Sequence, residues 1–219
     1  MIRALTIITT LLFASAVFAD DAAPQAQPAP VPETPAKPFV YTPKATDIVM
    51  GKDTAPVVMV EYASLSCPHC GHFYNTVLPD LTTKYIDTGK VKLVYRDYPL
   101  NAPALKAAEL VQCADPDRRH VFLKVLFNTQ EKWAYDANYK DVLANVAALG
   151  GIDKAKFEAC MKDAVIEKAI LASAKEAQDD YKVQSTPTFF INGKPSQGNH
   201  DVENMSKLID IALTDAGQK

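Results

Sequence analysis

The chain has 219 residues, 48% of them hydrophobic, and a formal charge of −3 at pH 7. A chain of this length and composition can bury a sizeable core within one domain, which excludes a disordered or fibrous protein. Lysine and arginine residues are scattered among a small excess of acidic residues. Nucleic-acid-binding proteins typically concentrate positive charge on one surface, so we expect no nucleic-acid partner.

The first 19 residues have the pattern of a secretory signal peptide. Arg3 supplies a positive charge at the start, an apolar stretch covers residues 4–18, and Val17-Phe18-Ala19 forms a small-residue cleavage site. An uncleaved membrane anchor is the alternative, but a membrane span needs about 20 apolar residues and this stretch is shorter. We therefore expect cleavage after Ala19 and export of the mature chain.

A proline-rich segment follows the predicted cleavage site. Seven prolines occur among alanines and glutamines between Asp20 and Pro43, and such a composition cannot bury a core. We expect residues 20–45 to form a flexible tether and residues 46–219 to form the folded domain.

The central motif of the domain is Cys67-Pro68-His69-Cys70, which follows an apolar, β-branched run from Val57 to Tyr62. The run predicts a strand that is buried on both faces, and the two thiols then stand in the first turn of the next helix. Free amide groups at a helix start stabilise negative charge, and the thiolate is the form that attacks a disulfide. We therefore expect Cys67 to be the nucleophile and Cys70, within one turn of it, to resolve the mixed disulfide.

The two residues between the thiols favour the same chemistry. Pro68 fits the first helical turn at little cost, because its missing N–H would have no helical partner there. His69 can donate a hydrogen bond or positive charge to the thiolate. The alternative for Cys67 and Cys70 is half of a zinc site, but a closed zinc site needs two more ligands, and His72 offers at most one nearby. We expect no metal.

Helix and strand patterns predict a sheet whose two parts are separated by helices. Strands are expected at residues 46–50, 57–62, 91–97 and 188–191, with a short edge strand at Pro195; helices are expected at 67–87 with a kink at Pro79, 105–113, 118–130, 138–149, 154–181 with a break, and 202–213. The first part forms a βαβ unit and the last a ββα unit, with a helical insertion over about residues 102–182. The sequence therefore predicts one α/β domain.

The two remaining cysteines, Cys113 and Cys160, fall in different helices of the predicted insertion. Four cysteines permit three pairings, and an exported protein meets an oxidising compartment. We expect Cys113 and Cys160 to form a structural disulfide that cross-links two helices of the insertion. A second redox centre is the alternative.

These features together resemble the thioredoxin fold, in which a Cys-x-x-Cys motif opens a helix after a buried strand and a proline precedes the third strand. In this sequence the pair Thr186-Pro187 stands at that place. The helical insertion, the Cys67-Pro68-His69-Cys70 motif and the signal peptide narrow the resemblance to periplasmic thiol:disulfide oxidoreductases of the DsbA type. The resemblance extends from Thr46 to the C terminus. The runs at residues 85–91 and 186–190 are also similar to a bacterial branch of that family.

The resemblance assigns roles to three further residues. It implies that Pro187 is cis and faces the two active-site sulfurs, and that the backbone of Thr186 pairs with an extended substrate. Thr186 differs from the commonest DsbA residue at this place and is similar to that of disulfide isomerases. Glu61 matches the buried acid that thioredoxin-like proteins keep beneath the resolving cysteine, where it can take a proton from Cys70.

The resemblance also implies a function. We expect the protein to donate its Cys67–Cys70 disulfide to reduced, unfolded exported proteins in the periplasm. It would be reoxidised by a membrane-bound, quinone-linked partner, and would act as a monomer without a cofactor. A disulfide isomerase or reductase is the alternative within the same chemistry, although isomerases usually add a dimerisation domain and only the proline-rich segment precedes Thr46 here. A thiol-binding chaperone module is a third hypothesis.

Overall fold

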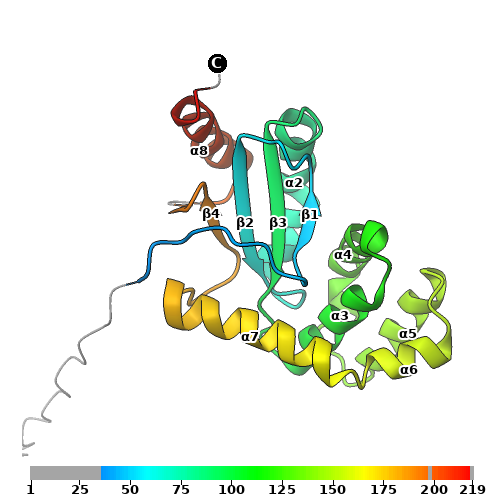
Figure 1. Ribbon diagram of the computed structural model, residues 1–219. Helices are drawn as coiled ribbons and strands as arrows, with labels where there is room; N and C mark the ends of the chain where they lie inside the picture. The colour runs from blue at the N-terminus through cyan, green and yellow to red at the C-terminus, as the bar shows by residue number, and fades with distance from the viewer. Residues whose placement is uncertain (1–35, 197–198, 218–219) are drawn as a thin grey trace, which may run out of the picture. The chain divides into compact units, whose positions relative to one another are not determined.

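A computed structural model describes residues 36–196 and 199–217, which are organised around one mixed five-stranded sheet (Figure 1). Its strands, in the order β1-β3-β2-β4-β5, are β1 (Ile48–Met50), β3 (Val91–Asp97), β2 (Val57–Ala63), β4 (Thr188–Ile191) and β5 (Lys194–Pro195). The central strand, β2, pairs parallel with β3 and antiparallel with β4. The two edge strands are both antiparallel to their neighbours. The predicted α/β fold is confirmed.

A helical run from Pro68 to Ile86 follows β2, as the pattern over residues 67–87 predicts. It consists of α1 (Pro68–His72), a π-helical turn (Phe73–Val77), α2 (Leu78–Leu81) and a second π-helical turn (Thr82–Ile86). The two π-helical turns flank the segment that contains Pro79, the residue expected to kink the helix.

The insertion is helical throughout, and a last helix closes the described part of the chain. The insertion helices are α3 (Ala102–Cys113), α4 (Arg119–Asn128), α5 (Tyr139–Leu149), α6 (Lys154–Cys160) and α7 (Ala164–Tyr181), with short 3-10 turns at Pro116–Arg118 and Gln130–Lys132, and the last helix is α8 (Val202–Asp215). The predicted helices agree with these to within three residues at their ends, and the predicted break separates α6 from α7. No described helix combines the length and the apolar character that a membrane span needs.

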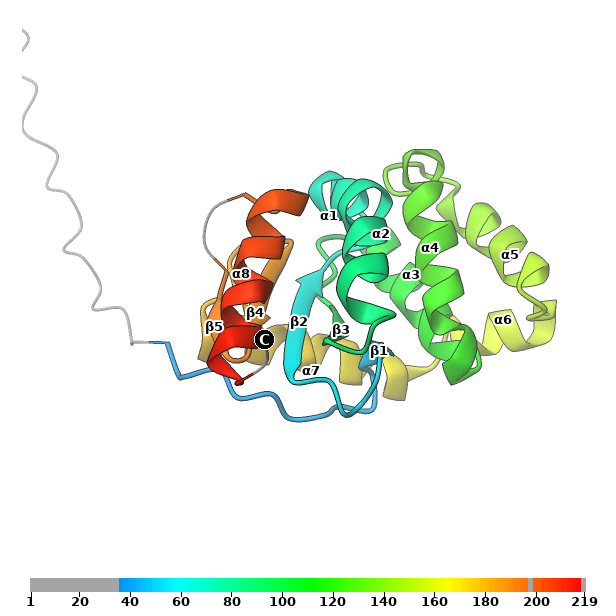
Figure 2. The same cartoon turned by 90° about the horizontal axis from the view of Figure 1, so that it is seen from above.

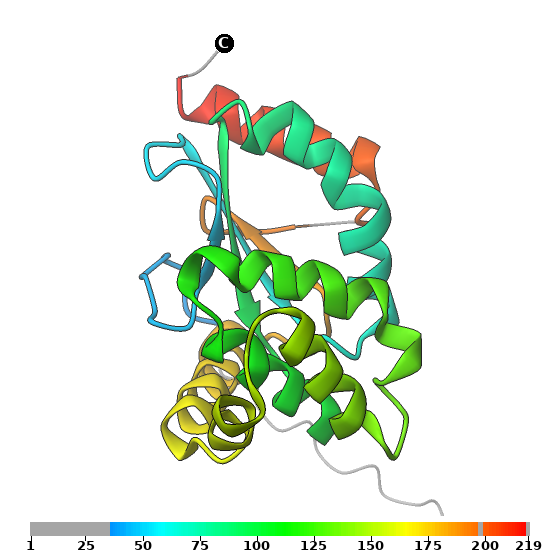
Figure 3. The ribbon, with the colours of Figure 1, turned by 90° about the vertical axis from the view of Figure 1, so that its right-hand side faces the viewer.

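Side chains of β2 alternate between two hydrophobic cores, because successive residues of a strand point to opposite faces of the sheet. Met59 and Ala63 belong to a large core shared with the active-site helix, the insertion and α8. Val60 and Tyr62 belong to a smaller core that includes Ala177 of α7. Figure 3 shows α2 and α8 on one side of the sheet and α7 on the other. The strand before the cysteines is therefore covered on both faces, as predicted.

The end of the proline-rich segment belongs to the folded domain, which corrects the predicted boundary of the tether. Phe39 is buried and its ring stacks on that of Phe190, with centroids 4.2 Å apart. Edge contacts with Tyr62 and Tyr181 complete the cluster. A single aromatic side chain can anchor an extended segment, and average composition does not reveal such an anchor. The predicted signal peptide and residues 20–35 lie outside the described residues.

A disulfide joins the end of α3 to the end of α6 in the insertion. Its cysteines are Cys113 and Cys160, whose Cα atoms are 6.0 Å apart. The other two cysteines, Cys67 and Cys70, are free thiols, so the structure represents the reduced form of the motif.

Replacing both Cys113 and Cys160 by serine is expected to lower the thermal stability of the protein. The cross-link spans 47 residues of sequence. In the chain-entropy account a loop of that size contributes on the order of 4 kcal/mol by restricting the unfolded state. Circular dichroism melts of the two proteins measure the loss. The initial rate of disulfide exchange at Cys67 should stay nearly unchanged, and a large loss of rate without a loss of stability would contradict a structural role.

Candidate active site

Cys67 occupies the N-cap position of α1, and Pro68 takes the first helical position as predicted. The neutral Cys67 thiol makes no capping hydrogen bond to α1. It donates instead to the backbone carbonyl of Thr186, with Sγ and O 3.2 Å apart. The Thr186–Pro187 peptide bond is cis, as the resemblance implies. The start of the helix and the loop before β4 therefore meet at the Cys67 sulfur.

The environment of Cys67 favours its thiolate. A hydrogen bond from the Cys70 thiol is the largest effect that lowers the pKa of Cys67, to about 5, and burial opposes it. The Thr186 side chain and the backbone N–H groups of Cys70 and His69 also lower this pKa. At neutral pH the reduced protein therefore carries a nucleophilic thiolate at this position.

His69 acts on the sulfur through its backbone. Its N–H lies at the start of the helix and lowers the pKa of Cys67, whereas its side chain is exposed and makes no hydrogen bond to another described residue. Donation from the His69 imidazole to the thiolate remains a prediction.

Cys70 and Glu61 form a buried pair beneath the nucleophile. Burial raises the pKa of the Cys70 thiol far above its usual range, and the hydrogen bond to Cys67 and the charge of Glu61 add to the effect. Glu61 is fully buried in β2, and neither carboxyl oxygen has a hydrogen-bond partner among the described residues. Burial, and then the charge of Cys67, raise the pKa of Glu61 to about 8. Glu61 therefore holds a proton at neutral pH, and exchange of this proton with Cys70 stays a prediction.

Neighbouring strands explain why Glu61 is so strongly desolvated. It lies opposite Tyr95 of β3 and Phe189 of β4, and both of these aromatic side chains are fully buried. A carboxylate in such surroundings loses its hydration without gaining a charged partner, so the neutral acid is favoured.

Two insertion residues that the sequence analysis did not single out hold the loop before the nucleophile. Gln130 donates from Nε2 to the carbonyl oxygens of Leu65 and Cys67, at 2.7 and 3.0 Å. Tyr135 donates from its hydroxyl to the carbonyl oxygen of Ser66, at 2.8 Å. Three consecutive carbonyl groups are thus fixed by side chains from one short segment of the insertion.

Gly71 is the one sequence feature that could have indicated this contact. A Cβ atom at Gly71 would lie 2.8 Å from Oε1 of Gln130, so a larger residue would displace the glutamine. Glycine in a helix costs about 1 kcal/mol relative to alanine, and its presence in the first turns indicates a close approach by another group. The partner in that approach is not marked by any motif.

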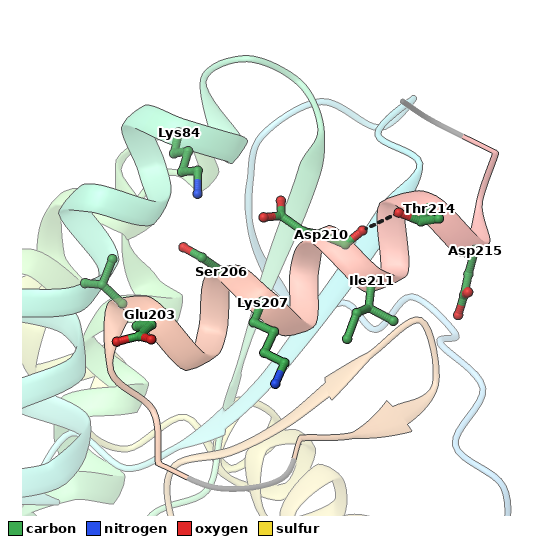
Figure 4. A pocket seen from close by; sticks show the side chains of 9 residues that line it. Lys84, Glu203, Ser206, Lys207, Asp210, Ile211, Thr214 and Asp215 are labelled. Carbon is green, nitrogen blue, oxygen red and sulfur yellow. Dashed lines mark hydrogen bonds between the residues drawn. The ribbon is translucent and has the colours of Figure 1, made fainter.

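A hollow of about 850 Å³ follows the outer face of α8, and Figure 4 shows its lining side chains. Lys84 contributes from the helical run before β3, and Lys207 and Asp210 contribute from α8. No cysteine or predicted site residue lines this hollow, so it does not belong to the candidate active site.

Within the described ranges, no three His, Cys, Asp or Glu side chains are grouped so that they could hold a metal ion.

Comparison with known proteins agrees with this geometry. The sequence profile of a family described as Thioredoxin matches residues 43–211. The crystal structure of Wolbachia pipientis alpha-DsbA1 superposes with a TM-score of 0.72 at 32% identity, covering 80% of this chain and 94% of that one. The chain belongs to the DsbA-like branch of the thioredoxin family. Oxidised BdbD from Bacillus subtilis shares the fold, with a TM-score of 0.66 at 24% identity over 82% of this chain and 97% of its own.

Relatives from Rickettsia species are longer than this chain. A candidate protein-disulfide oxidoreductase of Rickettsia prowazekii is 34% identical over 79% of this chain and 64% of its own length. Matches to proteins of Rickettsia felis and Rickettsia typhi likewise cover 62% and 63% of those proteins. The chain thus spans a little less than two thirds of the rickettsial relatives that it matches first.

Glu61→Gln is expected to stabilise the protein at pH 7 and above but not at pH 4. The folded pKa of about 8 lies above the ordinary value of 4.5, so the wild type loses stability as pH rises between these values. Glutamine cannot ionise, and the difference at pH 7 should be roughly 3 kcal/mol. Urea unfolding of the reduced proteins, in which Cys67 is a thiol or thiolate, measures it at pH 4, 6 and 8. An equal gain at all three pH values would contradict the raised pKa.

Gln130→Ala is expected to raise the pKa of Cys67, because the loop that presents the sulfur to the helix start loses two hydrogen bonds. A hydrogen bond contributes about 1 kcal/mol, so the shift should be at most about one unit. The absorbance of the thiolate, followed against pH, measures it. Gln178→Ala is the matched control, since Gln178 is exposed on α7. Equal pKa values in wild type and Gln130→Ala would show that the loop needs no support from the insertion.

Proposed function

We propose that the protein is a thiol:disulfide oxidoreductase that introduces disulfides into exported proteins by exchange through the Cys67–Cys70 pair. The observation that carries the proposal is the position of the Cys67 sulfur at the start of α1, 3.2 Å from the carbonyl oxygen of Thr186, in surroundings that lower its pKa to about 5. A stable thiolate favours the reduced form of the pair, so the oxidised form readily accepts electrons from substrate thiols. Membership of the DsbA-like branch supports the same activity.

The proposed reaction begins from the Cys67–Cys70 disulfide. A substrate thiolate attacks the Cys67 sulfur, which forms a mixed disulfide and breaks the bond to Cys70. Cys70 leaves as a thiolate and takes the proton that Glu61 holds. A second substrate thiolate then attacks the substrate sulfur and releases Cys67 as a thiolate. Two electrons pass from the substrate to the pair, and the substrate gains one disulfide.

The Thr186-Pro187 loop is the proposed substrate-binding element. The carbonyl oxygen of Thr186 lies 3.2 Å from the Cys67 sulfur, so a polypeptide bonded to Cys67 would pass beside this backbone. An extended substrate could pair with Thr186 through main-chain hydrogen bonds, as an added strand does at a sheet edge. Because proline lacks an N–H, Pro187 leaves no competing donor at this point.

The reduced pair must pass two electrons to an oxidant before the next cycle. We assign this step to a membrane-bound, quinone-linked partner in the periplasm, with the protein acting as a monomer. The signal-peptide pattern of residues 1–19 and the DsbA-like fold support this location and partner.

A disulfide isomerase or reductase remains the competing function, because Thr186 is similar to the residue that isomerases carry. The reduction potential of the Cys67–Cys70 pair, measured in glutathione buffers, separates an oxidase from a reductase. An oxidase is expected to have a potential more positive than about −180 mV, whereas a value below about −250 mV would indicate a reductase.

A double serine variant of Cys67 and Cys70 should lose all oxidation of reduced, unfolded protein. Full activity in that variant would instead support a chaperone.

The reduced protein is expected to melt at a higher temperature than the oxidised protein at pH 7. The folded pKa of Cys67, about 5, lies below the ordinary value of 9.0, so the reduced form gains stability as pH rises between them and loses it as pH falls through 5. Melting temperatures of both forms from pH 4 to pH 8 measure the difference. A difference that is constant with pH would contradict the proposal, and Cys67→Ser provides the control without a titrating thiol.

A further inference from the structure

Tyr135 combines a fixed hydroxyl with an exposed ring beside the nucleophile. The hydroxyl donates to the carbonyl of Ser66, the residue directly before Cys67. The residue as a whole is nevertheless 73% exposed, whereas its neighbours Trp133 and Ala134 are fully buried. The hydrogen bond therefore holds an aromatic ring in solvent close to the reactive sulfur.

A second exposed apolar side chain is anchored to the same loop. Leu100 is 54% exposed, and its backbone N–H donates to the hydroxyl of Ser64 at 3.3 Å. The Ser64 and Ser66 hydroxyl groups are 3.1 Å apart. The next residue, Asn101, donates from its side chain to the carbonyl of Ala134 at 3.2 Å, so the chain segments that carry Leu100 and Tyr135 lie side by side.

Tyr135 belongs to the insertion, and Leu100 comes just before α3, its first helix. Figure 2 shows α1 between α8 on one side and α4 of the insertion on the other. Thr186, which precedes β4, approaches the Cys67 sulfur from the part of the domain that also carries α8. A polypeptide that is bonded to Cys67 and pairs with Thr186 can thus meet a second surface, on the insertion.

We propose that Tyr135 and Leu100 contact the substrate polypeptide and favour an apolar side chain next to its reacting cysteine. This inference rests on the proposed function, because the occupant is the reduced polypeptide held at Cys67 by the mixed disulfide. An aromatic ring already fixed by its hydroxyl loses little conformational freedom on contact. Apolar side chains of unfolded chains are exposed before folding and buried after it, so such a surface selects unfolded substrates.

Competition between two dithiol peptides tests the proposal. The peptides differ only beside the first cysteine, where one carries leucine and the other glycine. The oxidised wild type should oxidise the leucine peptide about fivefold faster in kcat/KM, the size expected for partial burial of one apolar side chain. Tyr135→Ala and Leu100→Ala should each lower this ratio towards one. The ratio cancels any change in the reactivity of Cys67, which acts on both peptides equally.

Two further variants separate substrate contact from loop support. Tyr135→Phe keeps the ring but loses the hydrogen bond to Ser66, and it should preserve most of the preference. Leu149→Ala, which removes an 89% exposed apolar side chain on α5, should leave the ratio as in the wild type. A wild-type ratio of one, or a ratio unchanged in Tyr135→Ala, would overturn the proposal. Failure to oxidise either peptide would instead overturn the proposed function.

Discussion

A buried thiolate at the start of α1 is the feature on which the rest of the site depends. A charge that leaves water needs other groups to stabilise it, and burial by itself would raise the pKa of Cys67. The Cys70 thiol, the Thr186 side chain and two backbone N–H groups provide that stabilisation. These groups come from the helix start and from the loop before β4, so the chemistry requires the sheet to bring both together.

Burial acts in the opposite direction on the two groups beneath the nucleophile. Cys70 and Glu61 lie deeper than Cys67 and have no positively charged neighbour among the causes of their shifts, so their neutral forms are favoured. The result is one lowered pKa at Cys67 and two raised pKa values, at Cys70 and Glu61, beneath it. This difference gives the cysteines unequal roles: Cys67 is a good nucleophile and leaving group, and Cys70 requires a proton when it leaves.

The insertion does more than cover one end of the sheet. Gln130 and Tyr135 bind three consecutive carbonyl groups of the loop that ends at Cys67. These hydrogen bonds fix the backbone of the loop that presents the Cys67 sulfur at the start of α1. The disulfide between α3 and α6 also lies within the insertion, whereas the redox motif lies at the start of α1. The two cysteine pairs of this domain are therefore separate in place and in role.

Local sequence determined the elements and the reactive pair. Alternating and continuous apolar runs predict the strands and helices, because burial of one face requires a fixed period, and the spacing of Cys67 and Cys70 places both in one helical turn. Tertiary structure alone decided the burial of Phe39 and the contacts of Gln130 and Tyr135. Each of these depends on a partner more than 60 residues away in sequence, as the separation of 65 between Gln130 and Leu65 shows. A lone glutamine or tyrosine has no local pattern that specifies such a partner, since a hydrogen bond depends on where the folded chain places both groups.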